Sequence, residues 1–239
     1  NLVAWSKITD QLYIWHYSTN FAHYLMPLPS IDEIRTSIPI YKKYGAVGLF
    51  YQGSYQSPGG ALAELKSYLC AKLMWNASVD SGAVLKDYLN GVYGKGGPIM
   101  GQWIDLIHSE VRKSKKNHAF IYDGPTNPYM TDKVIAKSYE LFDKASKAAA
   151  DNPVALREID KARMWMQYVS LTKTNVKYVV DGNEYKSTGQ DVDQNLKDSF
   201  AKNLRDFGVR NISEGNANVD GFLKSLGNSA KFKVYTLEN

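Results

Sequence analysis

Aromatic and amide side chains gather directly after two short apolar segments near the start of the chain. Leu12–Tyr17 (LYIWHY) runs into residues 18–21 (STNF), and Ala46–Gln52 (AVGLFYQ) runs into residues 53–56 (GSYQ). A sugar ring presents an apolar face and a rim of hydroxyls, which require a stacking surface and neutral hydrogen-bonding groups. Since ligands of parallel α/β folds bind where strands pass into loops, we predict that the glycan-facing residues are Trp15, Tyr17, Asn20, Gln52 and Tyr55.

Neither strand end carries a carboxylate, and the next acidic residues, Asp32 and Glu64, fall in segments with a helical pattern. Ordinary glycosidic hydrolysis needs two suitably separated carboxyl groups. The sequence therefore identifies no catalytic residue, and a catalytic pair is expected elsewhere. A second interpretation stays open, in which Trp15 and Phe50 belong to the core and the tyrosines cover its rim.

Metal and nucleotide chemistry find no support in the sequence. The histidines, His16, His23, His108 and His118, show no metal-ligand spacing with Cys, Asp or Glu. Glycine-rich phosphate loops and the GxSxG nucleophile motif are also absent from the sequence. We expect no metal and no cofactor, and the single cysteine, Cys70, is expected to be a buried thiol.

Hydropathy and the placement of charge argue against a membrane span and a nucleic-acid partner. The chain has 239 residues, with 29 Lys+Arg against 24 Asp+Glu, and no apolar run long enough to span a membrane. The basic run at residues 112–118 (RKSKKNH) follows a helical pattern, and cations at a helix C-terminus complement the helix dipole. It also lacks the interleaved aromatics of single-strand binders, so we expect a solvated helix end and no nucleic-acid partner.

A strand–helix–strand unit must position the two strand ends. Residues 31–44 are compatible with a crossover helix, although Pro39 interrupts it, so the flanking segments should form parallel strands. Two parallel strands do not form a stable sheet alone. We therefore expect partner strands from outside this segment, or a sheet whose larger part lies upstream.

The remainder of the chain has helical periodicity. Helices are expected from residue 62 to about 75, and over 81–93, 98–116, 131–150, 153–180 and 191–207, with an alternating edge strand at 231–237. A Pro/Gly/Asn-rich break at 123–128 (DGPTNP) suggests a joint. The pattern predicts a mainly α chain, divided into 1–120 and a helical C-terminal domain over 121–239.

Three segments carry a family resemblance. LYIWHYSTNF at 12–21, GLFYQGSYQSPGG at 48–60 and AELKSYLCAKLMWN at 63–76 resemble a bacterial family of uncharacterised, glycoside-hydrolase-like domains. The last two are more distantly similar to the end of the barrel in alpha-glucuronidases. The resemblance implies that residues 1–120 hold the last two strands of a (β/α)8 barrel with its following helices, and that the parent protein is secreted, periplasmic or on the cell surface. Relatives often carry an acidic residue at the positions of His16 and Tyr51, so no acid or base role transfers to them.

Two functions remain open on the sequence. In the first, the chain is the C-terminal portion of a carbohydrate-active, glycoside-hydrolase-like protein, contributes glycan-facing residues and is inactive alone because it lacks the carboxylate pair. Its partners would be an oligo- or polysaccharide and an upstream barrel segment of the same parent. The alternative is a non-catalytic helical module that binds carbohydrate or another protein.

Overall fold

The computed structural model describes residues 1–113, 118–173, 176–181, 184–190, 192–215, 217–226 and 231–233. Helices predominate, as the sequence predicts. They are α1 Leu2–Trp5, α2 Ile31–Lys43, α3 Ala63–Trp75, α4 Ser81–Tyr93, the 3₁₀ turn η1 Gly94–Gly96, α5 Gly97–Lys113, α6 Asp132–Ala148, α7 Pro153–Thr172, α8 Gln194–Asp206 and α9 Val219–Ser225. The strands are β1 Leu12–Tyr17, β2 Ala46–Gln52, β3 Val176–Asp181, β4 Glu184–Gln190 and β5 Lys231–Lys233.

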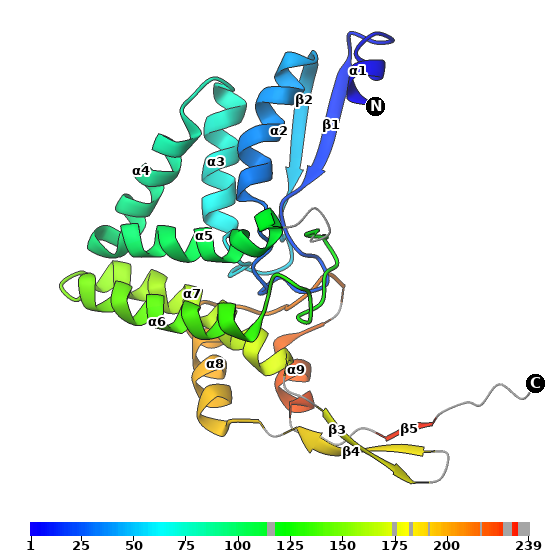
Figure 1. The fold of residues 1–239 in the computed structure, drawn as a ribbon, viewed down its shortest axis with the longest axis vertical. Helices are drawn as coiled ribbons and strands as arrows, with labels where there is room; N and C mark the ends of the chain where they lie inside the picture. Colours follow the sequence, from blue (N-terminus) through cyan, green and yellow to red (C-terminus); the bar gives the residue numbers. More distant parts are fainter. Residues whose placement is uncertain are drawn as a thin grey trace, which may run out of the picture.

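The predicted strand–helix–strand unit is present at the N-terminal end. β1 and β2 pair in parallel, with Ile14 opposite Leu49 and Trp15 opposite Phe50, and α2 connects them, running through Pro39 without a break. Helices α2 and α3 lie on one side of the pair (Figure 1). Within the part of the chain that the structure describes, no further strand joins this sheet, so both strands are edge strands.

The helices from α3 onward share one hydrophobic core. α5 packs against α4 and α6, α6 against α7, and α7 against α8, so that α5, α6 and α7 form a layer across the middle of the molecule (Figure 1). Trp103 sits at its centre, fully buried, with its ring centroid 5.2 Å from that of Phe142 and 6.1 Å from that of Trp165. The core is continuous from α2 to the end of α9, and the predicted boundary at residue 120 stays a prediction.

Side-chain caps explain where several helices begin. The Thr131 hydroxyl accepts a hydrogen bond from the backbone N–H of Val134 at 3.2 Å, which confirms the predicted start of α6. Asn152 caps α7 in the same way, with Pro153 in the first turn, where its missing N–H needs no partner. These positions were readable from sequence because capping is local.

The C-terminal half contains strands that the sequence analysis missed. The helix predicted over 153–180 ends at Thr172, and Val176–Asp181 instead forms β3 of a three-stranded antiparallel sheet in the order β3-β4-β5. The segment VKYVVD is rich in β-branched and aromatic residues, which favour a pleated strand over a helix. The region 121–239 is therefore not purely helical. The predicted edge strand at 231–237 is present as Lys231–Lys233, and residues 234–237 lie outside the described residues.

Candidate functional site

The side of the β1–β2 sheet that faces away from α2 and α3 is covered with aromatic rings. Side chains alternate across a strand, and the outward set is exposed to 71% at Tyr13, 64% at Trp15 and 39% at Tyr17, with 52% at Phe50 on β2. The rings of Trp15 and Phe50 meet edge to face, with centroids 4.9 Å apart. Among the described residues, Trp15 and Phe50 therefore lie outside the hydrophobic core, in contrast to the alternative interpretation.

Gln52 fixes the orientation of the Trp15 ring. The indole Nε1–H donates a hydrogen bond to Gln52 Oε1 at 3.1 Å across the two strands. Among the described residues the Gln52 side-chain nitrogen has no protein partner, so it stays available as a donor beside the exposed ring. Trp15 and Gln52, both predicted to face the glycan, thus lie side by side, and their role as ligand contacts stays a prediction.

Aromatic rings continue from the sheet onto the loops at the strand ends. Tyr17 packs edge to face on Phe21 with centroids 5.7 Å apart, and Phe21 lies 6.0 Å from Tyr122. Tyr122 is 61% exposed although it lies far from β1 in the sequence. We call the exposed rings of Tyr13, Trp15, Tyr17, Phe50, Tyr55 and Tyr122 the aromatic row.

Tyr55 connects the aromatic row to an acidic side chain, that of Glu214. Its hydroxyl donates a hydrogen bond to Glu214 Oε1 at 3.1 Å, between residues 159 positions apart. This bond raises the pKa of Tyr55, and burial raises it further. Sequence reasoning missed both Glu214 and Tyr122, because their approach depends on how distant loops pack; the only local sign was the polar, Gly- and Asn-rich stretch at 211–218 (NISEGNAN).

Asn20 differs from the other predicted site residues because it is 1% exposed. Its Oδ1 accepts hydrogen bonds from the backbone N–H groups of Ala22 and His23, and its Nδ2 donates to the carbonyl of Asp123 at 2.8 Å. The amide is therefore committed to the loop at the end of β1. Its observed place is beneath the aromatic row, where it ties this loop to the one that carries Tyr122.

The opposite side of the sheet holds a buried polar layer. Lys66 is 2% exposed and donates to the carbonyl of Ser18 at 2.8 Å, and burial lowers its pKa to about 7. Burial raises the pKa of the neighbouring Cys70 thiol to about 12, as expected of an unreactive buried cysteine. His16 lies 3.2 Å from the Tyr41 hydroxyl and 3.1 Å from Glu33 Oε2. These groups connect the sheet to α2 and α3 and do not reach the aromatic row.

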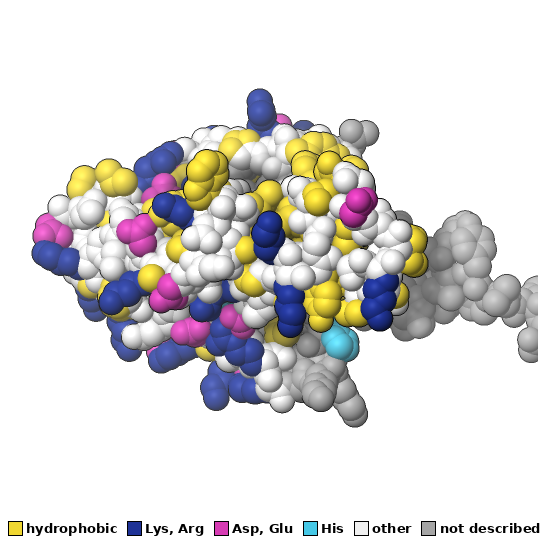
Figure 2. Space-filling view, turned by 90° about the horizontal axis from the view of Figure 1, so that it is seen from above, with side chains coloured by type: hydrophobic (Ala, Val, Ile, Leu, Met, Phe, Trp, Pro, Cys, Tyr) yellow, Lys and Arg dark blue, Asp and Glu magenta, His cyan; other side chains and the backbone are white. Residues whose placement is uncertain are grey.

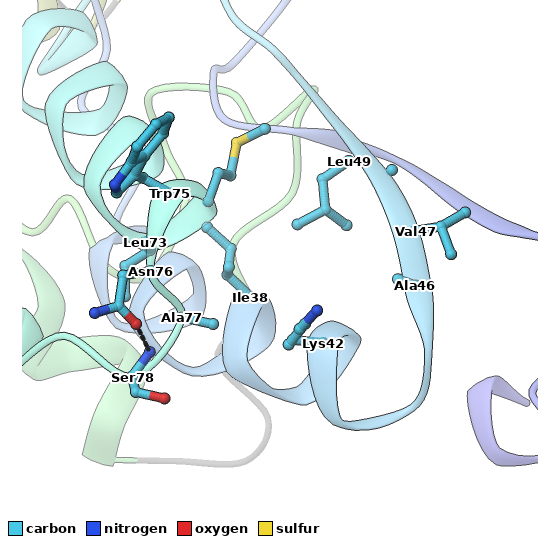
Figure 3. A pocket seen from close by; sticks show the side chains of 12 residues that line it. Ile38, Lys42, Ala46, Val47, Leu49, Leu73, Trp75, Asn76, Ala77 and Ser78 are labelled. Carbon is cyan, nitrogen blue, oxygen red and sulfur yellow. Dashed lines mark hydrogen bonds between the residues drawn. The ribbon is translucent and has the colours of Figure 1, made fainter.

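A separate groove lies at the start of β2. It encloses about 450 Å³ between the start of β2, the end of α2 and the end of α3, and Figure 3 shows Lys42 on α2 between Ala77 and Ala46. Among the described residues that line the groove, Lys42 is the only charged one, and none is a carboxylate. Trp75 at its rim is 93% exposed. Gln52 is the last residue of β2, so this groove lies at the opposite end of the strand from Gln52 and the strand-end loops.

The surface charges form pairs. Arg112 binds Asp32 through two hydrogen bonds of 2.6 and 2.9 Å and reaches Asp105 at 3.2 Å, while Lys113 pairs with Glu110. Lysine, arginine and acidic side chains are interspersed over the face in Figure 2. This fits the predicted solvated helix end, although residues 114–117 of the basic run lie outside the described residues.

The described residues contain neither a metal-binding cluster nor a membrane-spanning helix. Among the described residues, no group of three or more His, Cys, Asp or Glu side chains could hold a metal ion. In the same residues, no helix combines the length and apolar character needed to cross a bilayer.

Comparison with known proteins identifies only the N-terminal part of the chain. Residues 1–105 match the model of a domain of unknown function, DUF4838, which covers β1, β2 and α2 to α4 with part of α5. No curated protein and no solved structure matches the chain. The N-terminal region is thus similar to an uncharacterised domain family. The matched residues include Trp15, Gln52 and Tyr55, whereas Tyr122 and Glu214 lie beyond them.

Proposed function

We propose that the chain is the C-terminal portion of a carbohydrate-active, glycoside-hydrolase-like protein and that the aromatic row contacts its glycan. The observation that carries the proposal is the exposed Trp15 ring, held by Gln52 and flanked by Phe50 on a sheet face that no other described element covers. A large apolar ring with a fixed orientation and neighbouring neutral amide groups suits the CH face and hydroxyl rim of a sugar.

The spacing of the rings favours an extended glycan over a single sugar. Trp15 and Tyr17 project from the same side of β1, two residues or about 7 Å apart along the strand, and Phe21 links Tyr17 to Tyr122 on the adjoining loop. A chain of sugar units that crosses the C-terminal ends of the strands, where barrels of this type bind ligands, would meet the exposed rings of Tyr17, Tyr55 and Tyr122. Binding would then accumulate over several weak stacking contacts.

The same proposal accounts for the two-stranded parallel sheet. Such a sheet is marginal alone, and both strands present unpaired backbone edges to solvent within the described structure. In the proposed parent protein, strands of an upstream barrel segment pair with these edges and complete a (β/α)8 barrel. The catalytic carboxylates belong to that segment, so the present chain contributes binding and no hydrolysis, and the parent is an exported or cell-surface protein.

Calorimetry on the full-length parent tests the proposal. Trp15→Ala is expected to weaken binding of neutral cello- or xylo-oligosaccharides at least about tenfold, because it removes the central stacking face. Trp75→Ala is the matched control, since this ring is 93% exposed but lies at the groove on the far end of β2. Unchanged affinity in Trp15→Ala, or an equal loss in Trp75→Ala, contradicts the proposal.

A further inference from the structure

We infer that Glu214 contacts the ligand at the aromatic row and makes this site select neutral or amino sugars over uronic acids. The inference rests on the proposed glycan function and specifies its substrate class. It also extends the site beyond residues 1–105, which are the residues matched by the family model.

The loop that carries Glu214 is built into the strand-end region by hydrogen bonds. Its own backbone N–H donates to the carbonyl of Phe21 at 2.8 Å, and Tyr24 N–H donates to the carbonyl of Ile212 at 2.7 Å. Gln56 binds both backbone groups of Gly215, accepting from its N–H at 3.0 Å and donating to its carbonyl at 2.9 Å. The backbone that carries Glu214 is therefore held from both sides by the loops that follow β1 and β2, and its carboxylate is held by Tyr55.

The carboxylate keeps most of its hydrogen-bonding capacity. Glu214 is exposed, Tyr55 occupies one acceptor site at 3.1 Å, and no cation pairs with it among the described residues. An ionised carboxylate has about four acceptor sites and no donor. Hydroxyl groups of a neutral sugar, and the ammonium of an amino sugar, complement those sites.

Its negative charge acts on the neighbouring rings. Tyr24 has its pKa raised to about 12, first by burial and then by the charges of Tyr55 and Glu214. Tyr55 and Tyr24 therefore stay protonated at neutral pH, and Tyr55 remains the donor that holds the carboxylate in place. The buried amine of Lys66 donates to the Ser18 carbonyl, on the side of the sheet that faces α2 and α3. Since no cation pairs with Glu214 among the residues that the structure describes, a uronate carboxylate arriving at the row would meet a like charge, which disfavours binding.

Binding of three hexamers of different charge to the whole protein tests the inference: cellohexaose, the fully deacetylated chitosan hexamer and hexagalacturonate. We expect the wild type to bind the first two at least about tenfold more tightly than hexagalacturonate. Glu214→Gln should weaken chitosan-hexamer binding about tenfold and reduce that preference, and Glu214→Lys should favour hexagalacturonate, because each changes the charge while Gln keeps the shape. Glu140→Gln removes another exposed negative charge, on α6, and should leave all three affinities unchanged.

The outcomes separate this inference from the proposed function. If Trp15→Ala weakens binding but Glu214→Gln leaves the three affinities in their wild-type ratio, the glycan function stands and the role of Glu214 is wrong. Tighter wild-type binding of hexagalacturonate also overturns it. If the wild type binds none of the hexamers, both the function and the inference fail.

Thermal unfolding of each variant checks that it is folded. Tyr55→Phe frees the carboxylate of Glu214 without removing it, so it should weaken chitosan-hexamer binding less than Glu214→Gln.

Discussion

Aromatic residues are buried in the helical layer and exposed on the N-terminal sheet. In the layer formed by α5, α6 and α7, Trp103 and Phe142 are fully buried and Trp165 is 2% exposed. On the sheet, Trp15 and Phe50 are more than half exposed, at 64% and 52%. The same residue types thus hold the fold together in one region and lie open to solvent in the other.

The polar atoms of the rings follow the same division. The indole N–H of Trp103 donates to the Ser138 hydroxyl at 3.1 Å and that of Trp165 to the carbonyl of Gly59 at 2.8 Å, so both tryptophans are buried without an unpaired donor. Trp15 donates instead to a surface glutamine. The fold gains little from an exposed ring, and contact with a ligand or partner is what such a face can serve.

The largest expected effect comes from cutting into the helical layer. Trp103→Ala should lower the free energy of unfolding by about 3–5 kcal/mol, because it leaves a cavity against Phe142 and Trp165 and removes the hydrogen bond from the indole to the Ser138 hydroxyl. Trp15→Ala should change it by no more than about 0.5 kcal/mol, as expected at the surface. Urea unfolding of both variants measures the contrast, and a loss at Trp15 as large as that at Trp103 breaks it.

A smaller effect, dependent on pH, is expected at Lys66 beneath the sheet. Burial lowers the folded-state pKa to about 7 from 10.5, so the unfolded chain binds more protons between these values. The destabilisation by the buried amine is then complete below pH 7 and fades as the pH rises toward 10.5. Lys66→Met should therefore stabilise the protein at pH 6, by an amount on the order of a few kcal/mol, and much less at pH 9.5.

Urea unfolding of wild type and Lys66→Met at the two pH values checks this difference. Lys72→Met, on the same helix but exposed, serves as the control and should show no such pH dependence. If Lys66→Met changed the free energy of unfolding equally at pH 6 and pH 9.5, the pKa of the Lys66 amine would not be lowered in the folded protein.

Removing a helix cap should have an effect of about 1 kcal/mol. Thr131→Ala leaves the N–H of Val134 without its side-chain acceptor at the start of α6. Thermal unfolding should show a lower melting temperature, with glycan binding unchanged because the cap belongs to the helical layer. A loss of binding on this substitution would mean that the two regions are not independent.

The smallest change in stability is expected at Gln52. Gln52→Ala removes the acceptor of the Trp15 indole and should alter the unfolding free energy by less than about 0.5 kcal/mol, while weakening oligosaccharide binding several-fold. Calorimetry on the variant measures the affinity. An affinity equal to that of the wild type would show that the ring orientation does not depend on this hydrogen bond.

Local patterns in the sequence were sufficient for most of the fold. The two short apolar runs LYIWHY and AVGLFYQ, with a helix-compatible segment between them, predict the parallel β1–α2–β2 unit, and Thr131 marks the start of α6. The end of α7 was predicted eight residues too late, from 172 to 180, because VKYVV fits an apolar stripe while its β-branched residues favour a strand. The segment forms a strand in the folded protein because β3 pairs with β4.

The site was only partly predictable for a related reason. Trp15, Tyr17, Gln52 and Tyr55 lie in or next to the two strands, so their position follows from the strand pattern. The buried state of Asn20 depends on the Asp123 carbonyl, and the approach of Glu214 to Tyr55 spans 159 residues. No local pattern in the sequence carries such contacts.

The most direct test of the central claim observes the tryptophans of both regions in one experiment. The chain has five tryptophans, and their indole N–H resonances in a ¹H–¹⁵N spectrum can be assigned by single Trp→Phe substitutions. On titration with cellohexaose, we predict that the Trp15 signal shifts progressively while those of Trp103 and Trp165 stay fixed. A Trp15 signal that does not move at saturating sugar, or equal shifts at the buried tryptophans, would contradict the account.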